Sequence, residues 1–421
     1  MSKTKVTLAG VEKFHRAVPL CGITSDFGVT QPHFASVAAT IPAASVSGPI
    51  NFVAEREAAE WILANDGSIS VELAAGTAAE RWLNLKAPGA LPKERFVVRI
   101  IDVRDGQVKS DEDLTRLARC QFLGDLNITS GNGSDRAVEL LARLPRVSRL
   151  GLAYHKSLRT SGLHGLGRIP TLSQLDITPE MVDDQLEFVR HLPQLRTLVI
   201  FGPNPPDISS LAEASQLRTI LLQTPDAVDD DKLAAVQARH GKLRIVVGWE
   251  KFRVVGHDPA HAAAAHLVKL GVECYGGRNY VEGRTKMLTP TDLEDGSVWS
   301  FEVRKVPATV QLSAPDCDIL TFLEMNHFTA EGQHEANTLA KSLSQNHQLN
   351  SVTMQDCDLT DAGLEHLHKL VGLRSLALLS TNVTKEGIQR LHRAIPDTYI
   401  YSDFGEFLQD YRVRAAATPS Q

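Results

Sequence analysis

The chain has 421 residues, of which 43% are hydrophobic and 22% charged, a composition ordinary for a soluble globular protein of two or three domains. Its formal charge of −6 comes from 44 basic and 50 acidic residues without a long block of like charge, which argues against a nucleic-acid partner. The five cysteines are far apart and never form C-x-x-C, so we expect neither a disulfide framework nor a zinc site.

Residues 1–50 match neither of the repeat series that follow, so we interpret them as an N-terminal arm or linker. The run from Phe34 to Ile50 is uncharged and contains two prolines, as is typical of a linker. The N-terminus has no continuous apolar segment of signal-peptide type, and the chain has no stretch of about 18 apolar residues. We therefore expect a cytoplasmic protein that does not contact a membrane.

A helix followed by a strand is predicted after this arm, and again in the middle of the chain. The first segment is EREAAEWILANDGSISVEL from Glu55, and the second is DPAHAAAAHLVKLGVECYG from Asp258. Each has an acidic start, an alanine-rich helix, a stop containing glycine and a short strand. Such a segment in front of a repeat series can cover the open end of the repeat core, so we predict two terminal caps.

Apolar triplets of the form L-x-x-L-x-L recur after the first cap. They are Val98, Ile101, Val103; Leu123, Leu126, Ile128; Val147, Leu150, Leu152; Leu172, Leu175, Ile177; Leu195, Leu198, Ile200; Leu217, Ile220, Leu222; and a degenerate copy at Leu243. Successive copies begin roughly 22 to 26 residues apart, a period typical of repeat architectures. A unit of this length is one strand and one helix, which bury their apolar sides only by stacking on neighbouring units.

A second series of triplets follows the second cap. It consists of Leu320, Leu323, Met325; Leu349, Val352, Met354; and Leu373, Leu376, Leu378, which begin roughly 24 to 29 residues apart. Stretches such as DRAVELLARLP, DDQLEFVRHLP and DAGLEHLHKLV lie between triplets and have apolar residues at helical spacing. Gly276 to Gly296 is rich in polar and turn residues, which indicates an insertion between the second cap and its repeats.

The segment DLTDAGLEHLHKLVGLRSLALLSTNVTKEGIQRLHRAIP resembles the leucine-rich-repeat family, in its bacterial subtype with T-D-A-G-L turns. The cap at Glu55 is similar to the AAEWVL-like segment of that subtype, and Cys357 matches the family's Asn or Cys, whose side chain satisfies backbone groups of a loop. The resemblance covers about residues 55–250 and 258–405. It implies an α/β solenoid with a curved parallel sheet on the concave side, helices on the convex side, and a role in binding proteins.

The two caps and two series together predict two capped modules. We expect the arm at 1–50, a first module at 51–252 and a second module with a C-terminal tail at 253–421. The two series also end alike, with LRIVVGWEKF near Leu243 and DTYIYSDFGEF near Thr398.

We expect no catalytic residues, cofactor, metal or small-molecule substrate. Asp-Phe-Gly occurs at Asp26 and Asp403 without the other kinase motifs, so we interpret both copies as coincidence. The trio His257, His261 and His266 is only partly cofacial on a helix, which favours solvated histidines over metal ligands. The acidic pairs and clusters at 183–184 and 229–231 precede helices, where capping is the ordinary role of carboxylates.

The concave face offers a candidate partner site. If triplet positions three, five and seven face outward, the early repeats present mostly polar residues, which we expect to be solvated. The next two repeats present three apolar side chains, Val199, Phe201 and Leu221, with the polar residues Thr197, Thr219 and Gln223 beside them. An exposed aromatic with aliphatic neighbours and a polar rim is typical of protein interfaces. Alternatively, Phe201 packs under its own loop, GPNPPD, or against the second module.

A row of arginines at triplet position two, namely Arg196, Arg218, Arg244 and Arg374, is a secondary candidate for an acidic partner, although a structural role at the rim is the simpler interpretation. The favoured function is a non-catalytic scaffold for a protein partner of unknown identity. The alternatives are a recognition subunit for a modifying enzyme of kinase or ubiquitin-ligase type, and an enzyme with a site between the modules near residues 250–300.

Overall fold

Most of the apolar triplets form short parallel strands, in which alternate side chains turn inward. Leu198 and Ile200 are 0% and 1% exposed, and Ile220 and Leu222 repeat the pattern on the next strand. Side chains alternate along a strand, so this burial fixes which residues face outward. In the part of the chain that is described, the strands form a ten-stranded sheet, an eight-stranded sheet and a separate hairpin.

The computed structural model describes most of residues 51–407, together with β1 (Ile23–Ser25) and β2 (Gly28–Thr30), which pair as the antiparallel hairpin. Outside the described residues lie 1–22, 26–27, 31–50, 75–81, 104–107, 130, 132–133, 143, 145, 154–157, 170, 183–185, 250–251, 278–285, 295–299, 321–322, 324, 326, 347–348, 371 and 408–421. The predicted arm and the acidic pair at 183–184 therefore fall largely or wholly outside them. So does much of the predicted insertion.

The ten-stranded sheet contains β3 (Ser68–Leu73), β4 (Trp82–Leu85), β5 (Phe96–Val103), β6 (Asp125–Ile128), β7 (Arg149–Gly151), β8 (Gln174–Ile177), β9 (Thr197–Phe201), β10 (Thr219–Gln223), β11 (Arg244–Gly248) and β12 (Phe252–Val254). Its α-helices are α2 (Phe52–Ala64), α3 (Asp111–Leu117), α4 (Asp135–Leu141), α5 (Thr160–Leu163) and α6 (Asp230–His240). Its 3-10 helices are η1 (Pro88–Ala90), η2 (His164–Arg168), η3 (Pro179–Met181), η4 (Glu187–His191) and η5 (Ser209–Glu213). The strands from β5 to β11 are parallel, and β3, β4 and β12 are antiparallel to their neighbours.

The eight-stranded sheet contains β13 (Glu273–Gly277), β14 (Lys286–Met287), β15 (Ser300–Val306), β16 (His327–Glu331), β17 (Ser351–Gln355), β18 (Ser375–Leu379), β19 (Tyr399–Ser402) and β20 (Gly405–Phe407). The helices of this part are α7 (Pro259–Leu270), α8 (Pro290–Glu294), α9 (Ala314–Ile319), α10 (Ala336–Leu343), α11 (Asp361–Leu367) and α12 (Lys385–Ala394). The strands from β15 to β19 are parallel.

Each sheet begins and ends in the same way. A long helix, α2 or α7, leads into a strand that is antiparallel to the repeats, and each parallel series closes with an antiparallel strand, β12 or β20. Each sheet has its own large core cluster, one reaching from Ala58 to Val255 and the other from Ala260 to Ile400.

The strand register corrects two of the predicted triplets. Thr329 of β16 lies opposite Thr353 of β17, so β16 is the strand of this unit and its inward residues are Phe328 and Ala330. The predicted triplet at Leu320 is wrong, because Leu320 ends the helix α9 and is buried from the helical side. An L-x-x-L spacing fits a helix end as well as a strand, and the less typical pair of Phe and Ala marks the true strand. The second correction concerns β11, where Arg244 lies opposite Thr219 of β10.

The stretch DDQLEFVRHLP is described only from residue 186 onward, and there it does not form the α-helix that its spacing predicts. Its described part is the 3-10 helix η4, and η5 occupies the same place in the next unit. The length of a unit is the separation in sequence of residues that pair on adjacent strands. Gln174 pairs with Thr197, and Thr197 with Thr219, so these two units are shorter than their neighbours. A 3-10 helix rises more steeply per residue, so it crosses the unit with fewer residues.

The T-D-A-G pattern stacks one helix on the next. Asp361 at the start of α11 accepts hydrogen bonds from the backbone N–H and the hydroxyl of Thr384, both at 2.7 Å, in the following unit. Gly387 leaves room for that carboxylate, since a Cβ there would collide with its Oδ1. Asp135 binds Ser161 beside Gly162 in the same way. The small residue and the acid of successive units are thus complementary.

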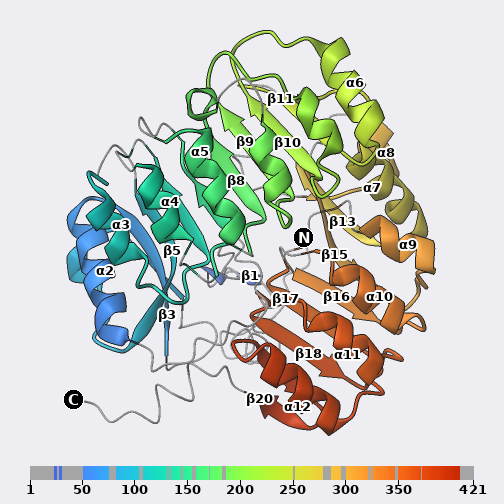
Figure 1. Cartoon of the computed structure of the whole chain (residues 1–421). Helices are drawn as coiled ribbons and strands as arrows, with labels where there is room; N and C mark the ends of the chain where they lie inside the picture. Colours follow the sequence, from blue (N-terminus) through green and yellow to red (C-terminus); the bar gives the residue numbers. More distant parts are fainter. Residues whose placement is uncertain are drawn as a thin grey trace.

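Side-chain contacts join the early units to the last ones. Arg146, in the turn before β7, forms an ion pair with Asp397, in the turn before β19. The Arg374 guanidinium lies 4.2 Å from the ring centroid of Trp82 on β4. Figure 1 shows the reason: the units follow an arc from α2 on the left, past α6 at the top, to α12 at the bottom, and bend back toward their start.

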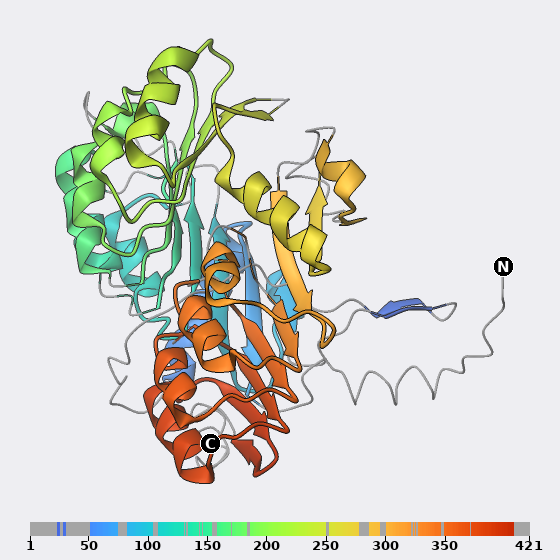
Figure 2. The same ribbon diagram turned by 90° about the vertical axis from the view of Figure 1, so that its right-hand side faces the viewer.

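The layering is visible from the side. In Figure 2 the orange and red helices lie to the left of the strands that they cover, so helices and strands occupy different faces of the arc. Stacked strand-and-helix units that repeat every roughly 22 to 25 residues, joined by a parallel register, define the architecture. The chain folds as a leucine-rich-repeat solenoid.

Candidate functional site

The predicted partner residues lie on two neighbouring parallel strands, β9 and β10, and share one face. The register places Thr197 beside Thr219, Val199 beside Leu221, and Phe201 beside Gln223. Phe201 and Leu221 are half-buried, whereas Val199 is only 4% exposed. The structure therefore brings the six residues together, and Phe201 and Leu221 are the apolar members that a second molecule could reach.

The middle row of this face continues onto β11. Val246 lies beside Leu221 and is 3% exposed, so Val199, Leu221 and Val246 form an apolar row that ends at Asp176 on β8. Val246 was missed because Leu243 was aligned as the first residue of its triplet. The register shows instead that Arg244 lies opposite Thr219, one position later than predicted. The inward residues Ile245 and Val247 set this register, and Arg244 does not belong to the arginine row.

The polar side chains on the other half of this face form ion pairs and hydrogen bonds with one another. The prediction that they are solvated is therefore wrong. Arg149 lies 3.4 Å from Asp176 and 4.0 Å from Asp125, and Gln174 donates to Asp176 at 2.9 Å. Asp125 and Asp176 are 5% and 6% exposed. Burial raises the pKa of Asp176, while Arg149 and Gln174 act in the opposite direction. These mutually bonded residues form a polar border beside the apolar row.

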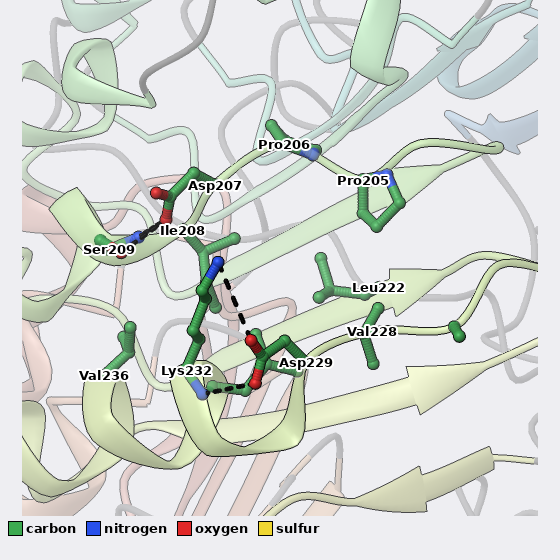
Figure 3. A pocket seen from close by; sticks show the side chains of 12 residues that line it. Pro205, Pro206, Asp207, Ile208, Ser209, Leu222, Val228, Asp229, Lys232 and Val236 are labelled. Atoms are coloured by element: carbon green, nitrogen blue, oxygen red, sulfur yellow. Dashed lines mark hydrogen bonds and ion pairs between the residues drawn. The ribbon is translucent and has the colours of Figure 1, made fainter.

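A pocket of about 270 Å³ lies at the carboxyl ends of the same strands, between the loop after β9 and the start of α6. Figure 3 shows Leu222 and Val236 among its apolar walls, with Asp229 and Lys232 on α6 and its cap. The Lys232 ammonium lies 3.8 Å from Asp229, whose carboxylate also caps the helix by accepting from the Lys232 N–H.

A further carboxylate in this pocket belongs to the neighbouring loop. Asp207 accepts from the N–H and hydroxyl of Ser209, and these bonds lower its pKa. Both acids are thus engaged in local turns. The pocket is an apolar hollow with a polar rim, and sequence patterns gave no signal for it because two loops from different units build it.

Comparisons with known proteins give only distant structural similarity. No protein-family model matches the sequence, and no curated protein matches it. Two solved structures from Listeria monocytogenes are similar to 86% of the chain. An internalin is matched over 99% of its length, with 13% identity and a TM-score of 0.28, and internalin C2 over 100%, with 11% and 0.26. At such values, the assignment rests on the strand register and stacked units described above.

The candidate metal histidines are separated in the structure. His261 Nε2 lies 2.8 Å from the Leu293 carbonyl oxygen, and His266 Nε2 lies 2.7 Å from Asp316. The backbone N–H of His257 donates to Gln237. Within the described residues, no group of three or more His, Cys, Asp or Glu side chains could hold a metal ion.

The remaining sequence motifs have structural roles. Asp403 lies in the turn between β19 and β20 and accepts from the Ser380 N–H at 2.7 Å, while Asp26 lies outside the described residues. Cys357 donates its thiol to the Gln355 carbonyl oxygen at 3.0 Å, in agreement with the role that the repeat resemblance implies. None of the described helices is both long and apolar enough to span a membrane.

Proposed function

We propose that the chain is a non-catalytic scaffold that binds a protein partner on the concave face, with Val199, Phe201 and Leu221 at the centre of the contact. Thr197, Thr219 and Gln223 form the polar rim. The observation that carries this proposal is the half-buried pair Phe201 and Leu221 on adjacent strands, next to buried valines. A rigid sheet holds both side chains in place, so little conformational entropy is lost when a partner covers them.

The border of the patch supports a specific contact. Asp176 and its partners Arg149 and Gln174 are already bonded to one another, so a partner need not compensate them individually. An apolar centre beside satisfied polar groups is the usual anatomy of a protein interface. Phe201 would be the largest anchor, and truncation of such an anchor typically costs about 2 kcal/mol or more of binding free energy.

Capture of partners from native lysate tests the proposal. The tagged full chain is compared with the double variant Phe201→Ala, Leu221→Ser and with the matched variant Tyr401→Ala, Phe404→Ala. Tyr401 and Phe404 are 44% and 46% exposed at the far end of the second sheet. A protein that is lost with the first variant and retained with the second supports the patch. Equal capture by all three chains would refute it, provided that circular dichroism shows each variant folded.

A recognition subunit for a modifying enzyme is the second candidate, because such a subunit needs two docking surfaces. Tyr401 and Phe404 are exposed aromatics far from Phe201 along the solenoid, and they are the natural candidates for the second surface. Loss of one set of captured proteins with each double variant would favour this function over a simple scaffold.

We further propose that the two capped sheets are separate modules, at about 51–252 and 253–421, of the bacterial T-D-A-G-L subtype. The paired caps, paired closing strands and separate core clusters support this division. The proposed boundary at 252/253 falls within β12, the strand that closes the first sheet. The buried thiols of Cys120, Cys274, Cys317 and Cys357 support a cytoplasmic location, since a reducing compartment keeps thiols free.

A further inference from the structure

Two arginines lie side by side at the start of the strands that carry the apolar patch. Arg196 directly precedes Thr197 on β9, and Arg218 directly precedes Thr219 on β10. The backbone N–H groups of Arg218 and Thr219 both donate to the Arg196 carbonyl oxygen, at 2.8 and 3.0 Å. The register therefore fixes the two side chains as neighbours, and the sheet holds them in place.

The two guanidinium groups converge on one backbone acceptor. Arg196 Nη1 donates to the Gln216 carbonyl oxygen at 2.9 Å, and Arg218 Nη1 lies 3.5 Å from the same oxygen. Arg218 Nη1 also donates to the carbonyl oxygens of Ser215 and Leu217, at 2.9 and 2.8 Å. Both side chains are half-buried. Neutral carbonyl groups orient these two cations but do not neutralise them.

Burial lowers the pKa of both guanidinium groups. Burial, with a contribution from the Arg218 charge, lowers the pKa of Arg196 to about 10, and burial lowers the pKa of Arg218 as well. Two like charges placed together in a half-buried site repel each other, and an anion bound between them would relieve that repulsion.

Several other arginines of the solenoid form an ion pair with a carboxylate. Arg99 pairs with Glu72 at 2.8 Å, Arg244 with Asp258 at 3.0 Å, and Arg304 with Glu302 at 2.7 Å. Arg149 and Arg146 also have aspartate partners. Across the residues that the structure describes, no carboxylate forms an ion pair with the Arg196 or Arg218 guanidinium, and only Nη1 of each has an acceptor.

We propose that Arg196 and Arg218 form a binding site for an oxyanion, a carboxylate or a phosphate group, that belongs to another molecule. The Nε and Nη2 donors of two neighbouring guanidinium groups match the several acceptor oxygens of such a group. The site adjoins the rim residues Thr197 and Thr219, so it deepens the proposed function by giving the partner an acidic or phosphorylated residue next to its apolar anchor. Small anions test it without any partner, so its failure is distinguishable from failure of the patch.

The experiment is a thermal melt of the full chain in buffered sodium chloride, and in the same ionic strength supplied partly as inorganic phosphate or as succinate. Anion binding should raise the melting temperature of the natural chain by about 2 °C or more. The variant Arg218→Gln should lose this shift. Arg218→Lys keeps the charge but not the planar fork, and should retain only part of it.

Arg190→Gln is the matched control, because it removes an arginine whose partner is Glu213 at 2.8 Å on the helical side of the same units. It should keep the full shift. A shift with phosphate alone assigns the site to a phosphate source, and a shift with succinate assigns it to a carboxylate. No shift with either anion, an equal shift in sodium chloride, or an undiminished shift in Arg218→Gln would overturn the proposal.

Discussion

Replacing Glu55 by glutamine should remove a large part of the pH dependence of stability. Glu55 lies on the cap helix α2 and is 1% exposed, with its carboxylate accepting from the Val98 N–H at 2.8 Å and the Gln121 N–H at 3.0 Å. It thereby ties the cap to β5 and to the turn before β6. Burial outweighs these bonds and raises its pKa from 4.5 to about 7.

The raised pKa of Glu55 decides whether its contribution to stability grows or shrinks as the pH rises. The folded chain holds the Glu55 proton more tightly than the unfolded chain, so this residue's stabilising contribution is present below about pH 4.5 and is lost as the pH rises through 7. A pKa unit corresponds to about 1.4 kcal/mol. Between pH 5 and pH 8, the free energy of unfolding of Glu55→Gln should therefore gain about 2–3 kcal/mol relative to the natural chain.

Urea unfolding followed by circular dichroism at pH 5, 6.5 and 8 measures this difference. Glu57→Gln is the control, because Glu57 faces solvent and its ion pair with Arg119 spans 3.7 Å between side chains that are 62% and 58% exposed. That variant should follow the natural chain at every pH. Parallel curves for Glu55→Gln and the natural chain would show that Glu55 does not titrate as its burial requires.

Three further substitutions test the fold. Phe328→Ala should destabilise the second sheet by about 3–5 kcal/mol, since Phe328 is 1% exposed, and a small effect in urea unfolding would undermine the corrected register. Gly363→Ala should lower the free energy of unfolding by about 1–3 kcal/mol, because a Cβ there would collide with Asn337 Oδ1. Gly89→Ala is the control, because a Cβ there meets open space, and it should be neutral. Equal melting temperatures for the two variants would contradict the stacking pattern. Asp397→Arg should lower the free energy of unfolding by about 1–3 kcal/mol, and adding Arg146→Asp should restore it, because the swapped charges can pair again. A double-mutant cycle that finds no coupling between the two positions would contradict this contact.

The sequence predicts the regular parts of this molecule well. Alternating leucines and valines indicate the strands because burial on one face demands that alternation, and the confirmed register of β9 and β10 places the patch residues where the triplets put them. Asparagine and glycine residues likewise mark where the cap helices end, since Asn65 is the C-cap of α2 and Gly271 is the C-cap of α7.

The remaining features depend on geometry that a local pattern does not encode. Leu243 was aligned as the first residue of a triplet, but the register of β11 differs from that alignment by one position. Leu320 fits the repeat spacing but lies at the end of the helix α9. Both errors arise because turns and helices also bury leucines. The Arg146–Asp397 contact depends on the curvature accumulated over many units. Asp176 faces outward but is buried, because neighbouring side chains on the same face, such as Arg149 and Gln174, contact it. An outward-facing polar residue can therefore be shielded from solvent.

The central claim is that a protein binds the concave face at Phe201, and site-specific photo-crosslinking tests it most directly. A benzophenone amino acid is placed at position 201, and in a second chain at position 270, where Leu270 ends the cap helix α7 and is 39% exposed. Irradiation in native lysate should give a protein adduct from position 201 and not from position 270. Adducts from position 270 alone, or the same adducts from both positions, would contradict a partner site on the concave face.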